Sequence, residues 1–146
     1  MKRIQLNLPF NSLTSFLEIY IDGASRGNPG RAGAGILMKD TDGSIHKLKK
    51  ALGILTNNQA EYQALINALK AAKELKKTHL KIHSDSLLLV NQINGIWRIR
   101  DSNILTLSKK AKSLLRGFKH VEIHHIPREL NKEADRLANA AIDEYP

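Results

Sequence analysis

Four acidic residues lie where elements of regular structure are predicted to begin or end. Asp22 follows the apolar run at 16–21 and Asp85 follows the one at 80–83, whereas Glu61 and Asp135 fall in the first turns of two amphipathic helical patterns. Crowded carboxylates repel one another unless a cation neutralises them. Because oxygen ligands suit Mg²⁺ or Mn²⁺ rather than zinc, the four acids form a candidate site for such ions.

Each acid also has an ordinary structural explanation. Asp22 precedes a glycine and is a typical turn residue. Glu61 lies three residues after Asn58, which is the spacing of a capping box, and Asp85 and Asp135 could complement helix dipoles. Each residue alone favours these explanations, but four acids at one sheet edge of a basic protein favour a metal site with phosphodiester chemistry.

The order of elements predicts that such an edge exists. Strands are expected at 16–21, at 32–38 and around 45–52, with a hairpin at Asp42-Gly43, followed by a helix over 60–75. A strand at 80–83, helices over 86–94 and 104–115, a strand at 121–125 and a helix capped by Asn131 complete the chain. This order predicts an α/β fold with a five-stranded mixed sheet. The first, fourth and fifth strands would be parallel neighbours, and ligands bind at the carboxyl ends of such strands.

The composition excludes several kinds of site and favours one kind of binding partner. The 146 residues include no cysteine, which excludes zinc–thiolate sites, iron–sulfur clusters and cysteine nucleophiles. Lys and Arg number 23 against 14 Asp and Glu, and the net charge of +9 favours a polyanion such as nucleic acid. Without a signal sequence or a long apolar run, we expect a cytoplasmic protein that does not bind membranes.

The first 15 residues differ from the rest. Ile4, Leu6 and Leu8 alternate with polar residues and predict a short strand that ends at Pro9. We therefore divide the chain into an N-terminal extension, 1–15, and a single domain, 16–146.

Four segments carry a resemblance to a known family. They are IYIDGASRGNPG (19–30), TNNQAEYQALINAL (56–69), HSDSLLLVNQINGIW (83–97) and PRELNKEADRLAN (127–139). In these segments and in their order the chain resembles type 1 ribonuclease H, which cuts the RNA strand of RNA–DNA hybrids. The resemblance covers nearly everything from residue 16 onward, and each segment contributes one of the four acids.

The resemblance implies a mechanism and a site. It makes Asp22, Glu61, Asp85 and Asp135 the catalytic and metal-binding carboxylates of a monomer that uses two Mg²⁺ ions, with Mn²⁺ as a substitute. The products would carry 5′-phosphate and 3′-hydroxyl ends. The resemblance also assigns six residues to substrate binding: Ser25, Asn28, Thr56, Asn57, Asn58 and Trp97.

Some of these substrate residues have a specific role by the same resemblance. Thr56 matches a phosphate pocket on the DNA side, and Asn28, Asn57 and Asn58 match groups in the minor groove, where RNA displays its 2′-hydroxyls. Helix capping is the alternative for Asn57 and Asn58. Core packing is the alternative for Trp97.

The chain departs from the better-known bacterial pattern in two places. Instead of a loop that carries a catalytic histidine, it has a Pro-Arg-Glu segment, as in a subgroup in which an arginine assists turnover, and Arg128 holds that position. His125 is the second candidate for this role, or is buried at the end of its strand. A basic protrusion is also missing, so double-stranded RNA becomes a further candidate substrate. Five cations are candidates for the missing backbone contacts: Arg98, Arg100, Lys109, Lys110 and Lys112.

Other functions share some of these features. The G-x-S-x-G pattern at 23–27 is that of a serine hydrolase, but a glycine-rich strand follows it where that motif needs a helix. The main alternative is a non-catalytic nucleic-acid-binding module of the same fold, for which a lost carboxylate would be the usual sign.

Overall fold

The computed structural model describes residues 15–145, so the strand expected at Ile4 to Leu8 lies outside the described residues. The elements are β1 (Leu17–Ser25), β2 (Gly30–Lys39), β3 (Ile45–Leu55), α2 (Asn57–Glu74), β4 (His79–Ser84), α3 (Leu87–Ile93), α4 (Ser102–Leu115), β5 (His120–His125), the 3₁₀ turn η1 (Arg128–Leu130) and α5 (Lys132–Glu144). Their order is the predicted one, apart from η1.

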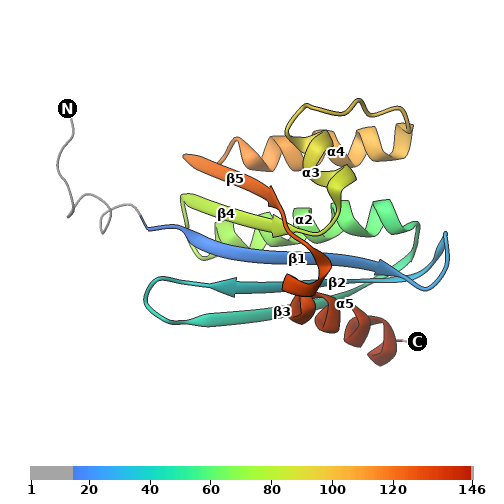
Figure 1. Cartoon of the computed structure of the whole chain (residues 1–146), viewed down its shortest axis with the longest axis horizontal. Helices are drawn as coiled ribbons and strands as arrows, with labels where there is room; N and C mark the ends of the chain where they lie inside the picture. The colour runs from blue at the N-terminus through green and yellow to red at the C-terminus, as the bar shows by residue number, and fades with distance from the viewer. Residues whose placement is uncertain (1–14, 146) are drawn as a thin grey trace.

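The five strands form one mixed sheet in the order β3-β2-β1-β4-β5. Strands β1, β2 and β3 pair antiparallel, and β1, β4 and β5 pair parallel, which confirms the predicted α/β architecture. Helices α2, α3 and α4 lie on one side of the sheet and α5 lies on the other (Figure 1). The main core lies between the sheet and α2, where side chains such as Ile19, Leu65 and Ile82 are fully buried.

The register between β1 and β4 sets the functional edge. The parallel ladder runs from Leu17 opposite Leu80 to Ile21 opposite Ser84. Asp22 is the next residue of β1, and Asp85 is the first residue after β4. The two acids therefore lie side by side, as predicted. However, β1 does not end at Asp22. It continues to Ser25 because β2 still pairs with it on the other side.

The start of α2 differs from the expectation. The N-cap is Thr56, whose hydroxyl accepts from the backbone N–H of Gln59 at 3.2 Å, while the side chain of Gln59 accepts from the N–H of Thr56 at 2.9 Å. This reciprocal pair is the capping box. The spacing of Asn58 and Glu61 therefore has no capping role, and Glu61 lies in the second turn of α2 rather than in the first.

Two glycines of β2 allow α5 to pack directly on the sheet. A Cβ added at Gly35 would lie 2.0 Å from the carbonyl oxygen of Ala134, and one at Gly33 would lie 2.4 Å from that of Ala138. The close neighbour of each glycine is the backbone of helix α5. This contact fixes the height of α5 above the sheet and, with it, the position of Asp135.

We predict that Gly35→Ala destabilises the fold. The added methyl would collide with helix backbone, which cannot rotate away as a side chain would, so the free energy of unfolding should fall by about 2–3 kcal/mol. Urea denaturation would measure this loss. Gly117→Ala is the matched control, because its Cβ would come no closer than 3.3 Å to another heavy atom. An equal loss in the two variants would contradict the close approach of α5.

Candidate active site

Three carboxylates meet at the edge where β1 and β4 separate. Asp22, Glu61 and Asp85 each offer an oxygen, and these oxygens all lie within 4.8 Å of one another. Asp22 and Glu61 are buried, at 6% and 5% exposed, whereas Asp85 is half-buried. The structure thus brings together three of the four acids that the sequence singled out, from β1, α2 and the residue after β4.

The position of Glu61 depends on a glycine. The backbone N–H of Gly23 donates to Oε1 of Glu61 at 2.8 Å. A Cβ at Gly23 would lie 2.2 Å from the carbonyl carbon of Ala60, so only glycine lets α2 come this close to β1. The contact turns the Glu61 carboxylate toward Asp22 rather than toward solvent.

Asp135 is exposed in the first turn of α5 and lies outside the group of three oxygens. It is nevertheless near Asp22. The pKa of Asp22 is raised to about 9, and burial is the largest cause. The charges of Glu61 and Asp85 raise this pKa further, and the Asp135 carboxyl adds to them. The amide of Asn139 donates to Oδ1 of Asp135 at 3.3 Å. The fourth acid therefore borders the cluster and faces solvent.

Burial and like charge together favour the protonated cluster. Burial raises the pKa of Glu61 to about 8, although the Gly23 N–H opposes this, and the charge of Asp85 raises it further. Within residues 15–145, none of the four acids forms a salt bridge with a lysine or arginine. The donor set contains only oxygen, its charge is unbalanced, and its members are within reach of one ion. These residues therefore fit a hard divalent cation such as Mg²⁺ or Mn²⁺.

Of the two candidates for an assisting cation, Arg128 acts on the cluster through its charge. It is exposed at the start of η1. Its positive charge lowers the pKa of Glu61, although burial, the Gly23 N–H and the charge of Asp85 have larger effects on that pKa. His125 ends β5 and is exposed, so the expectation that it is buried there was wrong. The reason is that β5 is an edge strand of the sheet, with a neighbouring strand on one side only.

Three of the predicted substrate residues line one depression. Asn28, Thr56 and Asn58 border a cavity of about 260 Å³, together with residues of α3 and α4. The side chain of Asn28 also accepts from the backbone N–H of Asn57 at 3.1 Å, which joins the loop after β1 to the start of α2. Asn57 and Asn58 are exposed inside the helix, and Thr56 is the N-cap, so helix capping does not explain either residue.

The other two substrate candidates differ from each other. Trp97 is 43% exposed, so the core-packing alternative for it was wrong. The hydroxyl of Ser25 is hydrogen-bonded to the carbonyls of Gly27 and Leu55, the latter at 2.8 Å. Ser25 therefore supports the turn between β1 and β2, and strand β2 follows it where a serine hydrolase would have a helix.

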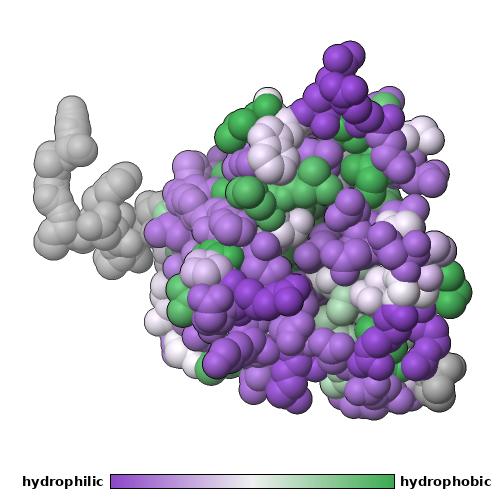
Figure 2. Space-filling view, turned by 45° about the vertical axis from the view of Figure 1, so that its right-hand side comes forward, coloured by the Kyte–Doolittle hydropathy of each residue, from purple (hydrophilic) through white to green (hydrophobic). Residues whose placement is uncertain are grey.

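The surface around this edge suits a polar partner. Figure 2 brings forward the side on which β1 ends in Figure 1, and the surface there is mainly hydrophilic with scattered apolar patches. All five cations proposed for backbone contacts are exposed: Arg98, Arg100, Lys109, Lys110 and Lys112. No helix in the described part of the chain has the length and apolarity to cross a bilayer.

One residue of the site was missed. Asn131 was expected to cap α5, but its side chain makes no capping bond. Its amide instead donates to the carbonyl oxygen of Ile21 at 2.8 Å and to Oδ2 of Asp85 at 3.1 Å. From the sequence, Asn131 could be predicted only to begin α5, because its two acceptors, Ile21 and Asp85, are remote from it in the chain.

Comparison with known proteins gives consistent results. Residues 20–141 match the family model described as reverse transcriptase-like. Ribonuclease HI of Halobacterium salinarum is 43% identical over 129 residues, 88% of this chain, and the chain spans 65% of that protein's length. A ribonuclease H of Chlorobium phaeobacteroides is 36% identical over 86% of this chain and 94% of its own length.

Solved structures agree. The crystal structure of the Halobacterium salinarum RNase H1 superimposes with a TM-score of 0.85 at 42% identity, covering 88% of this chain and 98% of that one. LC11-RNase H1 in complex with an RNA/DNA hybrid gives 0.83 at 34% identity, covering 88% and 97%. The fold, the acidic edge and these relatives lead to one conclusion: the chain belongs to the type 1 ribonuclease H family.

Proposed function

We propose that the chain is an endoribonuclease that hydrolyses the RNA strand of RNA–DNA hybrids, with residues 16–146 as its catalytic domain. The observation that carries this proposal is the trio Asp22, Glu61 and Asp85, whose oxygens lie within 4.8 Å at one sheet edge. The net charge of +9 over the whole chain favours a polyanionic substrate. The relative solved in complex with an RNA/DNA hybrid supports the choice of duplex.

The carboxylates would hold two divalent ions, Mg²⁺ or in its place Mn²⁺. Asp22 and Asp85 would contribute to both ion sites, Glu61 to the one nearer the leaving oxygen and the 2′-hydroxyl, and Asp135 to the other. When bound, such ions lower the pKa of an attacking water and stabilise charge on the departing oxygen. Breaking the bond between phosphorus and O3′ leaves a 5′-phosphate on one product and a 3′-hydroxyl on the other.

Other side chains of this chain would bind and orient the duplex. Thr56 would hold a phosphate of the DNA strand at the depression it shares with Asn28 and Asn58. Asn57, beside them on α2, would join the two asparagines in reading 2′-hydroxyls, because an amide both donates and accepts hydrogen bonds. The exposed indole of Trp97 would contact the DNA strand. Ser25 would contact the duplex from the turn between β1 and β2, which its hydrogen bonds stabilise.

Arg128 would assist the chemical step itself. A guanidinium near the carboxylates, on an exposed 3₁₀ turn, can approach the scissile phosphate from the solvent side. There it would stabilise negative charge as it builds on the phosphate and the leaving oxygen. The acids are already placed by packing, so Arg128 would affect the rate more than the binding of the duplex.

The first prediction from this proposed function concerns Asp85. In Mg²⁺, the wild type should cut the RNA strand of an end-labelled hybrid, and Asp85→Asn should lower kcat by about 10²–10³-fold because one charged ligand is lost. Asp42→Asn, on an exposed turn between β2 and β3, is the control and should cut normally. RNA–RNA and DNA–DNA duplexes in parallel lanes would define the range of substrates for a chain without the basic protrusion.

The outcomes of this assay separate the candidate functions. Unchanged cutting by Asp85→Asn would contradict the assignment of the site. Binding of the hybrid by the wild type without any cutting, in Mg²⁺ or Mn²⁺, would instead identify a non-catalytic nucleic-acid-binding module.

The second prediction concerns pH in the absence of divalent ions. The pKa values of Asp22 and Glu61 are raised from 3.8 and 4.5 to about 9 and about 8, so the folded state keeps protons that the unfolded chain has already released. The free energy of unfolding should therefore fall as pH rises from 4.5 to about 8. Asp22→Asn should flatten this slope in EDTA, and Mg²⁺ should restore stability to the wild type most strongly at high pH.

Thermal denaturation across this pH range, with and without Mg²⁺, would measure the effect. Asp42→Asn again serves as the control, because hydrogen bonds from Ser44 lower the pKa of Asp42 and its titration lies below this window. Identical slopes for the wild type and Asp22→Asn would contradict the burial of an unpaired carboxyl cluster.

The third prediction separates Arg128 from His125. Arg128→Ala should lower kcat by about 10- to 100-fold with little change in KM, because the lost charge acts on the transition state. His125→Ala should leave both constants near the wild-type values. Steady-state cleavage of a hybrid at fixed salt would measure both variants, and a reversed order would transfer the assisting role to His125.

A further inference from the structure

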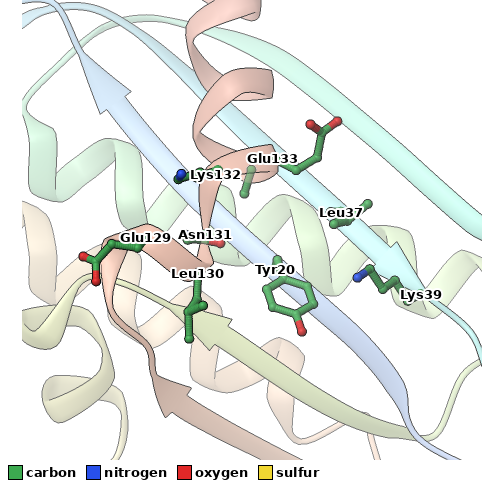
Figure 3. A pocket seen from close by; sticks show the side chains of 9 residues that line it. Tyr20, Leu37, Lys39, Glu129, Leu130, Asn131, Lys132 and Glu133 are labelled. Atoms are coloured by element: carbon green, nitrogen blue, oxygen red, sulfur yellow. The ribbon is translucent and has the colours of Figure 1, made fainter.

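Asn131 is a polar residue that is almost completely buried. It is 2% exposed, and it stands between η1 and α5, where its side chain could have capped the helix but does not. Figure 3 shows it where the chain turns from η1 into α5, among Leu130, Tyr20 and the other residues that line a depression of about 330 Å³ on the α5 side of the sheet. Burying an amide there costs free energy unless its hydrogen bonds are satisfied.

The amide nitrogen of Asn131 joins two strands at the point where their own pairing stops. The last pair of the parallel ladder is Ile21 opposite Ser84. One bond from Nδ2 of Asn131 goes to the carbonyl of Ile21 and the other to the Asp85 carboxylate, at 2.8 and 3.1 Å. A single side chain therefore bridges the backbone just before Asp22 and the side chain of Asp85.

The other end of the amide supports a specific role. Oδ1 of Asn131 is buried and has no hydrogen-bond partner among the described residues. The reverse orientation would place Oδ1 against the Ile21 carbonyl and the Asp85 carboxylate, which are both acceptors, so the amide can only donate to them. An unsatisfied buried carbonyl costs about 1–3 kcal/mol, and an apolar side chain would avoid this cost. Fold stability alone therefore does not explain this asparagine.

The backbone of Asn131 ties the fourth acid to the same point. Its carbonyl accepts the N–H of Asp135 at 3.1 Å in the first turn of α5. The residue thus holds α5, β1 and the end of β4 in one fixed relation. Asp135 lies on α5, Asp22 lies on β1, and Asp85 follows β4.

We propose that Asn131 is a positioning residue that restrains the Asp85 carboxylate, and the spacing of Asp22, Asp85 and Asp135, for binding divalent cations. This inference rests on the proposed function, because it assigns a role toward ions that the four acids would hold. Hydrogen bonds that orient a ligand carboxylate are typically worth 10–100-fold in metal affinity or activity. Because Asn131 is buried, it would act through the Asp85 carboxylate rather than on the substrate.

The test uses two variants that both remove the donor without adding charge, Asn131→Leu and Asn131→Ala. Mn²⁺ alone is titrated into each protein by calorimetry without nucleic acid, and circular dichroism in EDTA verifies folding. We expect Mn²⁺ to bind both variants about 10–100-fold more weakly than it binds the wild type. In Mg²⁺, kcat for the hybrid should fall while KM changes little. Asn67→Leu is the matched control, because the Asn67 amide donates to the carbonyl of Gln63 within α2 and to no other group among the described residues.

Three outcomes would overturn the inference. A role limited to the fold would lower the melting temperature in EDTA and leave Mn²⁺ affinity unchanged. Unfolding of both variants would also assign the amide to the fold, and a wild type that does not bind Mn²⁺ would remove the ions that the residue is proposed to serve. A wild type that binds Mn²⁺ but does not cut the hybrid would contradict the proposed function alone, because the comparison of Mn²⁺ affinities would still stand.

Discussion

The close approach of α2 to β1 at Gly23 is the constraint on which the site depends. A glycine there allows the backbone at Ala60 to come nearer than any side chain would permit. The Gly23 N–H then holds Oε1 of Glu61 at 2.8 Å, and the helix buries that carboxylate beside Asp22. Because burial is the largest cause of both raised pKa values, this single contact creates the electrostatic condition of the edge.

The rest of the fold keeps that condition from relaxing. A crowded carboxylate could escape repulsion by turning to solvent, but Glu61 is held by a backbone donor and Asp85 by the amide of Asn131. On the other side of the sheet, Gly35 fixes α5 and thus Asp135. The repulsion therefore remains in the folded protein, and protons or cations must offset it. Free energy released elsewhere in the core stabilises a site that is unfavourable by itself.

Local patterns and topology were sufficient to predict a five-stranded mixed sheet, the parallel pairing of its first, fourth and fifth strands, and the meeting of Asp22 with Asp85. Alternation and helical spacing give the strands and helices, and parallel strands bring their carboxyl ends to one edge. The capping of α2 is also local, because Thr56 and Gln59 have capping-box spacing in the sequence, but Asn58 and Glu61 have the same spacing and were predicted instead. Two other features depended on contacts between distant segments and were not predictable in this way. They are the exposure of His125 on an edge strand and the turning of Asn131 away from its helix. In both cases tertiary packing selected one of several local alternatives.

The charge distribution links the two kinds of ligand that such a site would take. The whole chain carries +9, which attracts a nucleic-acid duplex from a distance, yet the edge itself gathers four acids that repel a phosphate at close range. Without cations, the attraction and the repulsion therefore act on different parts of the same duplex. Cations at the edge would remove the repulsion where the scissile phosphate would lie, while the exposed lysines and arginines would act on phosphates farther along. It follows that divalent ions and hybrid should each strengthen the binding of the other, because each lowers the electrostatic cost of placing its partner at the edge.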